Sequence, residues 1–292
     1  MNILKALFGN SEQNPEEEKV EAEHKKFDLM KYDGVKAMKM GQFEYALRCF
    51  DEALKLKDDS EIRDYLSRVF IRLDRLDEAL EQLQLMAVAE PDNTDVKLQM
   101  AHVCYMKEDY AAMSDAVEQA LAVNGDLPQA HFMYAQSALK QGDVINGIAR
   151  LTKVVALDDN YADARLLRAQ TLLGIGDVKG AEEDSQWLSE RIEAQEDVLL
   201  LAARVAHAKG NDDEAIELYN KVVDQNPFLT EAYAERGKIY FGRGDSKKAE
   251  EDMRKVLELE PQGLANVSGD YSAEGVEHQT KQAYSNLNPF GL

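Results

Sequence analysis

The sequence predicts an all-α solenoid, and three observations support this fold class. The first is a fixed period: one position of a repeated phrase recurs every 34 residues, with a single interval of 33, which is typical of stacked structural repeats. The second is the scarcity of helix breakers, with 6 prolines and 17 glycines in 292 residues. The third is the helical spacing of apolar residues such as Ala46, Phe50 and Ala53. The residues at the recurring position are Gly41, Asp74, Glu108, Gly142, Gly176, Gly210 and Gly244.

Each period contains a short turn that is predicted to join two helices. The stretch GRGDSKKAEED at 242–252 aligns without gaps with GIGDVKGAEED at 174–184. The shared glycine suits the left-handed conformation that ends a helix, and the aspartate after it suits the start of the next helix. Residues 243–245 also spell Arg-Gly-Asp, the tripeptide that adhesive proteins present to integrins. Because the phrase recurs at the repeat spacing, the sequence favours a turn over an adhesion site.

The helices of each period carry small residues where two backbones would approach each other. Gly34 and Ala37 lie one turn apart in the first repeat, and a stripe of small and aromatic residues follows on the next helix. With this pattern the chain resembles the tetratricopeptide repeat family over residues 27–261, in about seven repeats. The resemblance implies a right-handed superhelix of helix-turn-helix repeats. The last repeat carries the fullest pattern, with Tyr233, Gly237, Tyr240, Gly244, Ala249, Met253, Val256 and Pro261.

The sequence predicts three segments. Residues 1–26 hold a short apolar stretch and an acidic helix start, residues 27–261 form the repeat array, and residues 262–292 hold a loop, a capping helix and a mobile end. Pro15, followed by three glutamates, predicts a first helix that runs from that residue to Met40. Two roles for the tail remain open: it caps the last repeat, or it folds back into the binding groove.

The fifth repeat departs from the pattern at its end, in the stretch DSQWLSERIEAQED. Ser185 stands where the other repeats favour an aromatic residue, and no proline follows. We expect the second helix of this repeat to run long. We also expect Trp187 to pack over the irregular joint rather than to bind a partner.

Composition excludes several classes of partner and compartment. The net charge of −21 repels phosphate backbones and anionic lipids, so no nucleic-acid partner is expected. The opening stretch MNILKALFGN lacks the features of a secretory signal, and the apolar run at 198–203 is too short to span a bilayer. Cys49 and Cys104 fall in different repeats and are predicted to be buried small hydrophobic residues rather than a disulfide. We therefore expect a cytoplasmic protein.

No motif of the sequence indicates catalysis, a cofactor or a metal. The stretch GIGDVKG at 174–180 lacks the spacing of a phosphate-binding loop. The histidines lack the spacing of four residues by which a helix presents two metal ligands. We therefore predict a protein without enzymatic activity. The alternative, an enzyme, would require a catalytic site assembled in the folded chain from residues that are distant in the sequence.

The resemblance places the binding site on the first helix of each repeat, where a concave groove is expected. An apolar groove that contains methionine suits a helix or an extended peptide with hydrophobic anchors. We predict a scaffold or adaptor for a protein or peptide of unknown identity, although the same residues could only seal one repeat against the next. Phe132, Met133 and Leu167 are expected to form one apolar patch. The candidate groove residues are Tyr65, Leu98, His102, Tyr105, Met106, Phe132, Met133, Leu139, Leu166, Leu167, Leu173 and Arg204.

Members of the family that bind chaperone C-terminal tails use a clamp of lysine, asparagine and arginine side chains. This chain has Lys31 at the first clamp position, but Val35 and Tyr65 replace the two asparagines. Asp95 and Gln99 stand in place of the next lysine and the arginine. The sequence therefore disfavours a chaperone tail as the partner.

Residues 1–9 support an alternative function. Ile3, Leu4, Leu7 and Phe8 fall on one face of this short stretch. They could anchor a membrane-peripheral assembly factor, although the acidic run that follows disfavours a membrane surface.

Overall fold

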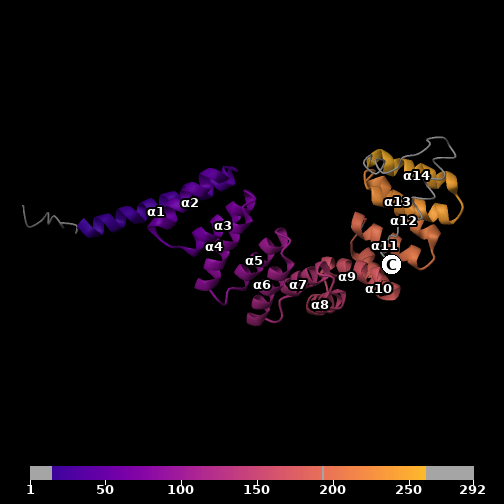
Figure 1. Cartoon of the computed structure of the whole chain (residues 1–292), viewed down its shortest axis with the longest axis horizontal. Helices are drawn as coiled ribbons and strands as arrows, with labels where there is room; N and C mark the ends of the chain where they lie inside the picture. Colours follow the sequence, from indigo (N-terminus) through magenta and orange to yellow (C-terminus); the bar gives the residue numbers. More distant parts are fainter. Residues whose placement is uncertain (1–14, 193, 261–292) are drawn as a thin grey trace, which may run out of the picture. The chain divides into compact units, whose positions relative to one another are not determined.

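The computed structural model describes residues 15–192 and 194–260, and this part of the chain consists of helices and the turns between them (Figure 1). Fourteen helices form within the described residues, which confirms the predicted all-α class. The chain divides after Asp143 into two compact units. This boundary falls inside the fourth predicted repeat, between α7 (Pro128–Lys140) and α8 (Val144–Leu157).

The first unit is built from helical hairpins. The helices α1, α3 and α5 each pack against the even-numbered helix that follows, each hairpin packs against the next, and α7 packs on α6. One buried cluster runs from α1 to α5, and a second runs from α5 to α7. The helices of this unit are α1 (Pro15–Lys39), α2 (Phe43–Leu56), α3 (Ser60–Arg72), α4 (Leu76–Ala89), α5 (Thr94–Met106), α6 (Tyr110–Val123) and α7 (Pro128–Lys140).

The second unit repeats the same arrangement. After α8, the pairs α9–α10, α11–α12 and α13–α14 pack as hairpins, and neighbouring hairpins contact each other. Buried clusters join α9 to α11, α11 to α13, and α13 to α14. The helices of this unit are α8 (Val144–Leu157), α9 (Ala162–Gly174), α10 (Val178–Arg191), α11 (Glu196–Ala208), α12 (Asp212–Gln225), α13 (Thr230–Gly242) and α14 (Ser246–Leu259).

All seven recurring turn positions adopt the left-handed conformation that the period predicts. The five glycines have φ between 71° and 81°, and Asp74 and Glu108 have φ of 57°. A side chain in this region is strained by its own Cβ, so glycine is the favoured residue and the two others are exceptions. The helical hairpins therefore follow the register deduced from the sequence.

The Arg-Gly-Asp tripeptide is the turn between α13 and α14. Gly244 has a φ of 78°, and the side chain of Asp245 accepts a hydrogen bond from the backbone amide of Lys248. The Arg243 guanidinium forms an ion pair with Asp213. Each residue of the tripeptide thus has a role inside the repeat, as the turn interpretation predicts.

The close approach of helices depends on small residues, as expected. A Cβ placed on Gly34 in α1 would lie 2.5 Å from Cε1 of Phe50 in α2. Ala46, Phe50 and Ala53 on α2 are all fully buried. The Phe50 ring therefore fills the space that a side chain at position 34 would need.

The expectation for the end of the fifth repeat was wrong in one respect. Its second helix, α10, has 14 residues, the same length as α8 and α12, and it ends at Arg191. Ile192 has an extended backbone and Ala194 a left-handed one. The helix therefore ends at the same point of the repeat as α8 and α12, although no proline follows it. Trp187 packs at this joint, with its ring 4.3 Å from the Arg165 guanidinium carbon and 4.5 Å from that of Arg191.

The first helix begins at Pro15, as predicted, and ends one residue before Met40. The alternative membrane anchor at 1–9 and the predicted capping helix in 262–292 lie outside the described residues. No helix that the structure describes is long and apolar enough to cross a membrane.

Candidate binding site on the first helices

The candidate groove residues all lie on the first helix of a hairpin. These first helices are α1, α3, α5 and α7 in the first unit and α9, α11 and α13 in the second. We call the surface that they form in each unit the first-helix face. Phe132 and Met133 lie on α7 in the first unit, whereas Leu167 lies on α9 in the second. Because the two units are described separately, the predicted apolar patch of these three residues stays a prediction.

In the first unit, α5 presents apolar side chains to solvent. Tyr105 is 37% exposed and Met106 is 39% exposed, and His102, one turn earlier, is exposed as well. The Tyr105 ring contacts that of Tyr110 edge-on, with 6.2 Å between centroids. This segment keeps an aromatic ring and a flexible thioether accessible on the first-helix face.

Other candidates in the first unit belong to the interior. Leu98 and Met133 are buried in the cluster that joins α5, α6 and α7. Phe132 and Leu139 on α7 are half-buried. Leu98 and Met133 therefore seal one hairpin against the next, which is the alternative that the sequence left open.

Tyr65 lies at the junction of α1, α2 and α3. Its ring stacks on Phe50, with centroids 5.4 Å apart, and its hydroxyl donates to Oε1 of Glu61 at 2.8 Å. The Lys31 ammonium from α1 donates to the other oxygen of Glu61. The hydrogen bond from Lys31, followed by that from Tyr65, holds the pKa of Glu61 below its ordinary value. The ammonium of the residue at the first clamp position is thus already engaged within the unit.

The second unit contains a small polar pocket on its first-helix face. The pocket has a volume of about 240 Å³ and is formed by α9, α11 and α13. Two of the predicted groove residues, Leu173 and Arg204, meet there, whereas the half-buried Leu166 and Leu167 do not line it. Leu173 and Leu201 are buried and supply an apolar base. The lining residues are Gln170, Leu173, Gly174, Leu201, Arg204, Glu231 and Glu235.

Arg204 is held by carboxylates of the next first helix. Its Nε donates to Oε1 and Oε2 of Glu235 at 3.1 and 3.0 Å, and its Nη2 donates to Oε1 at 3.0 Å. The same Nη2 lies 2.5 Å from Oε1 of Glu231. The Tyr219 hydroxyl, from α12, donates to Oε2 of Glu235 at 2.7 Å. These bonds connect α11, α12 and α13 around one charged centre.

The protonation states of this cluster follow from its burial and charges. Burial acts to lower the pKa of Arg204, but the hydrogen bond and the charge of Glu235 outweigh it and raise that pKa. Burial, followed by the negative charge of Glu235, raises the pKa of Tyr219 far above its ordinary value. At neutral pH the guanidinium is therefore charged, and the phenol is a neutral hydrogen-bond donor.

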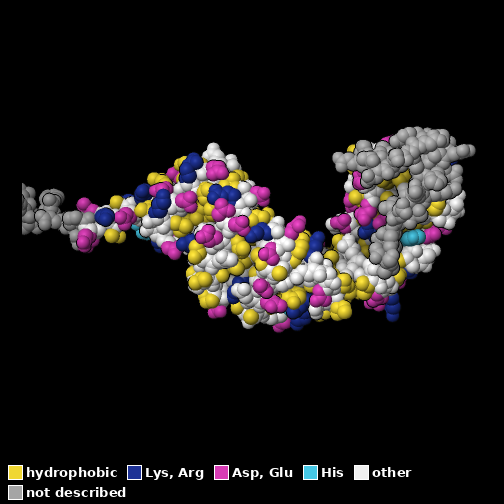
Figure 2. Space-filling view, viewed as in Figure 1, with side chains coloured by type: hydrophobic (Ala, Val, Ile, Leu, Met, Phe, Trp, Pro, Cys, Tyr) yellow, Lys and Arg dark blue, Asp and Glu magenta, His cyan; other side chains and the backbone are white. Residues whose placement is uncertain are grey.

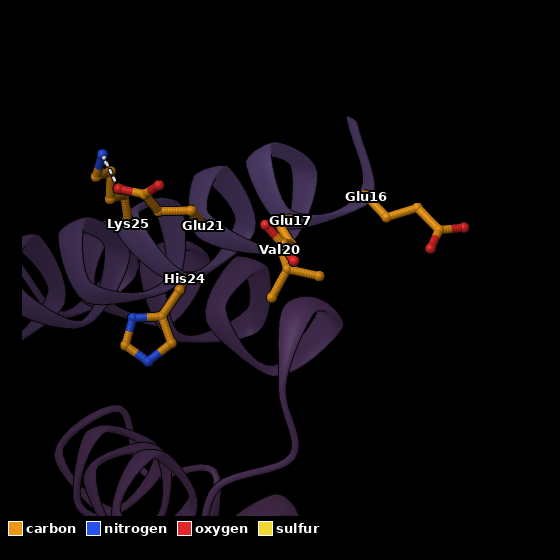
Figure 3. A pocket seen from close by; sticks show the side chains of 6 residues that line it. All are labelled: Glu16, Glu17, Val20, Glu21, His24 and Lys25. Carbon is orange, nitrogen blue, oxygen red and sulfur yellow. Dashed lines mark ion pairs between the residues drawn. The ribbon is translucent and has the colours of Figure 1, made fainter. Parts of the chain in front are cut away.

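A second hollow lies along the first half of α1 and carries no site. Figure 3 shows its six lining side chains, all from this one helix, pointing away from the helix in different directions. Glu21 and Lys25 form an ion pair of 2.7 Å along the helix, and His24 pairs with Asp28 at 3.3 Å. The lining side chains do not converge on a common point, so nothing there would hold a ligand.

The described residues show no other concentrated chemistry. Among them, no group of three or more His, Cys, Asp or Glu side chains could hold a metal ion. Cys49 and Cys104 are buried and free, as predicted. On the visible face of the first unit, acidic, basic and hydrophobic side chains are intermixed (Figure 2).

Sequence reasoning missed the partners of Arg204. Glu231 and Glu235 lie 27 and 31 residues after it, slightly less than one repeat, so they fall on the next first helix. Opposite charges at this spacing are the signal that could have identified the cluster, because neighbouring first helices lie side by side in a solenoid of this period.

Comparison with known proteins agrees with the architecture. Three family models, each described as a tetratricopeptide repeat, match residues 34–94 and 132–186, residues 197–228, and residues 230–262. Together these matches cover more than half of the chain. No curated protein matches it.

Several solved structures share the fold at low sequence identity. A tetratricopeptide repeat protein from Parabacteroides merdae has 15% identity and a TM-score of 0.66, with 90% of this chain and 100% of that chain covered. PilW, a type IV pilus biogenesis factor, has 18% identity and a TM-score of 0.62, with 76% and 98% covered. YrrB, described as having an unusual peptide-binding site, has 14% identity and a TM-score of 0.54, with 68% and 97% covered. These likenesses confirm a helical solenoid.

Proposed function

Since the chain belongs to the tetratricopeptide repeat family, we propose that it is a non-enzymatic scaffold that binds a peptide or helix of a partner protein on its first-helix face. The family consists in general of protein-interaction scaffolds. The observation that carries the finer proposal is the exposure of Tyr105 and Met106 on α5. An aromatic ring and a thioether that are both accessible to solvent are suited to cover a partner's apolar anchors.

Other features of the first unit favour the same face. Tyr32 on α1 is also exposed, so the first-helix face carries aromatic side chains on two helices. Tyrosine offers a large contact area at a low cost in side-chain entropy. The second helices of this unit expose one aromatic side chain, Tyr45 on α2, and the aliphatic Leu85, Val88 and Val123 on α4 and α6.

Two further observations favour a protein segment other than a chaperone tail as the partner. The Lys31 ammonium, which a chaperone-tail clamp would use, is paired with Glu61. The net charge of −21 opposes nucleic acid. We propose a peptide partner and a cytoplasmic location; the peptide-binding site named for YrrB is a property of that protein and lends this choice only the support of a shared fold.

Affinity purification with a matched control tests the proposal. The double variant Tyr105→Glu, Met106→Glu places two charges on the first-helix face without altering the core, because both side chains are exposed. The control is Val88→Glu, at a position 82% exposed on α4. A partner should be identified by mass spectrometry with the wild type and with the control, and should be lost from the double variant while the helical content stays unchanged. Equal capture by the well-folded double variant would overturn the proposed face.

A further inference from the structure

The pocket of the second unit has an excess of negative charge. Arg204 contributes one positive charge, Glu231 and Glu235 contribute two negative charges, and Tyr219 is neutral. Within the lining itself, one positive charge therefore faces two negative charges. Gln170, the remaining polar side chain of the lining, is uncharged.

The two carboxylates differ in what they can still accept. Each oxygen of Glu235 already accepts two hydrogen bonds, from Arg204 and Tyr219, and its side chain is only 17% exposed. Glu231 uses Oε1 for Arg204, its side chain is 53% exposed, and its Oε2 accepts no hydrogen bond from the described residues. An incoming cation would therefore meet Glu231 first.

The shape of the pocket limits the size of that cation. A volume of about 240 Å³ lies below the range typical of cofactor and drug-sized sites, so it fits one side chain rather than a larger ligand. Leu173 and Leu201 form an apolar base, and Gly174 leaves the rim open. An apolar base beneath a charged rim suits the aliphatic stem and charged end of lysine or arginine.

The neighbouring charges favour the same ligand. One period before Glu231 the chain has Asp197, and one period before Arg204 it has Gln170. The preceding pair of first helices therefore has a carboxylate at the position of Glu231 but no guanidinium at the position of Arg204. Asp197 is exposed and has no ion pair among the described residues. Lys238 on α13, whose charge interacts with that of Glu235, is partly buried and lies outside the lining.

We propose that this pocket binds the side chain of a lysine or arginine carried by an extended segment of a partner protein, with Glu231 as its counter-ion. The inference rests on the proposed function, since it assigns a basic residue to a peptide that binds the first-helix face of the second unit. The charge of the pocket makes it the opposite of a clamp for carboxylates.

Selection from a library of short random peptides tests the inference on the full-length protein. Selected peptides should share a lysine or arginine, and fluorescence anisotropy should show that its replacement by glutamine weakens binding about tenfold or more. Glu231→Gln should weaken binding of the parent peptide to a similar extent. The control Glu217→Gln, at an exposed position of α12, should leave the affinity unchanged. Glu231→Lys should restore binding to a peptide whose basic residue is replaced by glutamate.

The outcomes separate this inference from the proposed function. Peptides that lose affinity with the Tyr105→Glu, Met106→Glu variant but share no basic residue would refute the pocket assignment and leave the scaffold function in place. A shared basic residue whose contribution survives Glu231→Gln would also refute the assignment. Failure to select any peptide would overturn both proposals.

Discussion

Arg236 on α13 and Asp252 on α14 form a two-point ion pair, with Nε and Nη2 of the arginine 3.0 and 2.6 Å from the two carboxylate oxygens. Arg168 and Asp184, two repeats earlier, form the same pair between α9 and α10, with both distances 2.7 Å. In each case the carboxylate is buried. The pair therefore fastens the first helix of a repeat to the second helix of the same repeat.

Asp184 should be the more costly of the two carboxylates to neutralise. It is 1% exposed and accepts hydrogen bonds from Arg168 and also from Nη1 of Arg165, at 3.0 Å. Asp184→Asn would leave the half-buried Arg168 without a carboxylate, and we expect a loss of about 3–5 kcal/mol in the free energy of unfolding. Urea unfolding followed by circular dichroism measures it.

Two further variants calibrate that loss. Asp252→Asn should cost less than Asp184→Asn, because Asp252 pairs with a single arginine. Glu183→Gln, at an exposed position of α10, should be nearly neutral. A loss for Asp184→Asn no larger than that of Glu183→Gln would show that the buried pairs contribute nothing to stability.

The glycines on either side of Arg243 should respond oppositely to alanine. Gly244 has a φ of 78°, where a Cβ is strained, so Gly244→Ala should destabilise by about 1–2 kcal/mol. Gly242 ends α13 with open space around it, so Gly242→Ala should stabilise by about 0.5–1 kcal/mol. Thermal unfolding of the two single variants measures both effects. Shifts of the same sign would contradict the assignment of the turn.

The turns could be predicted from the sequence because their causes are local. The left-handed conformation is a property of one residue, and the glycines mark it directly. Asp74 and Glu108 are not glycines, yet both adopt the left-handed conformation. These two turns were located by the fixed period and not by the type of residue. The helices between the turns then follow from apolar spacing.

The burial of individual groove residues could not be predicted in the same way. Leu98 and Tyr105 lie on the same helix, yet Leu98 is buried and Tyr105 is exposed. Their exposure depends on how much of α5 the neighbouring hairpins cover. The sequence of one repeat does not determine how closely its neighbours pack against it. Arg204 was predicted as part of the groove, but its pairing with Glu231 and Glu235 depends on the distance between consecutive first helices.

The contact between α11 and α12 should tolerate no larger side chain at Ala215. This residue is fully buried on α12, in the cluster that joins α11 to α13. Ala215→Leu would overpack the interior and should lower the free energy of unfolding by about 1–3 kcal/mol. Lys221→Leu, exposed on the same helix, adds an apolar side chain without overpacking. An unchanged melting curve for Ala215→Leu would show that the repeat register is wrong.

The pairing of Glu61 with Lys31 should make the stability of the first unit depend on acidic pH. The hydrogen bond from Lys31 lowers the pKa of Glu61 below its ordinary value of 4.5, so the ionised carboxylate stabilises the folded state above that value. The contribution is lost as the pH falls through the lowered pKa. Glu61→Gln should therefore reduce the urea midpoint at neutral pH, and the difference from the wild type should shrink as the pH falls through the lowered pKa of Glu61.

The size of this effect is limited by solvent, since the Glu61 side chain is 53% exposed, and we expect about 0.2–1 kcal/mol at neutral pH. Glu81→Gln, at an exposed position of α4, is the control and should show no such dependence on pH. Lys31→Met should cost little more once Glu61→Gln is present, because both changes remove the same ion pair. A difference between Glu61→Gln and the wild type that persists unchanged in acid would mean that the carboxylate acts through its shape rather than its charge.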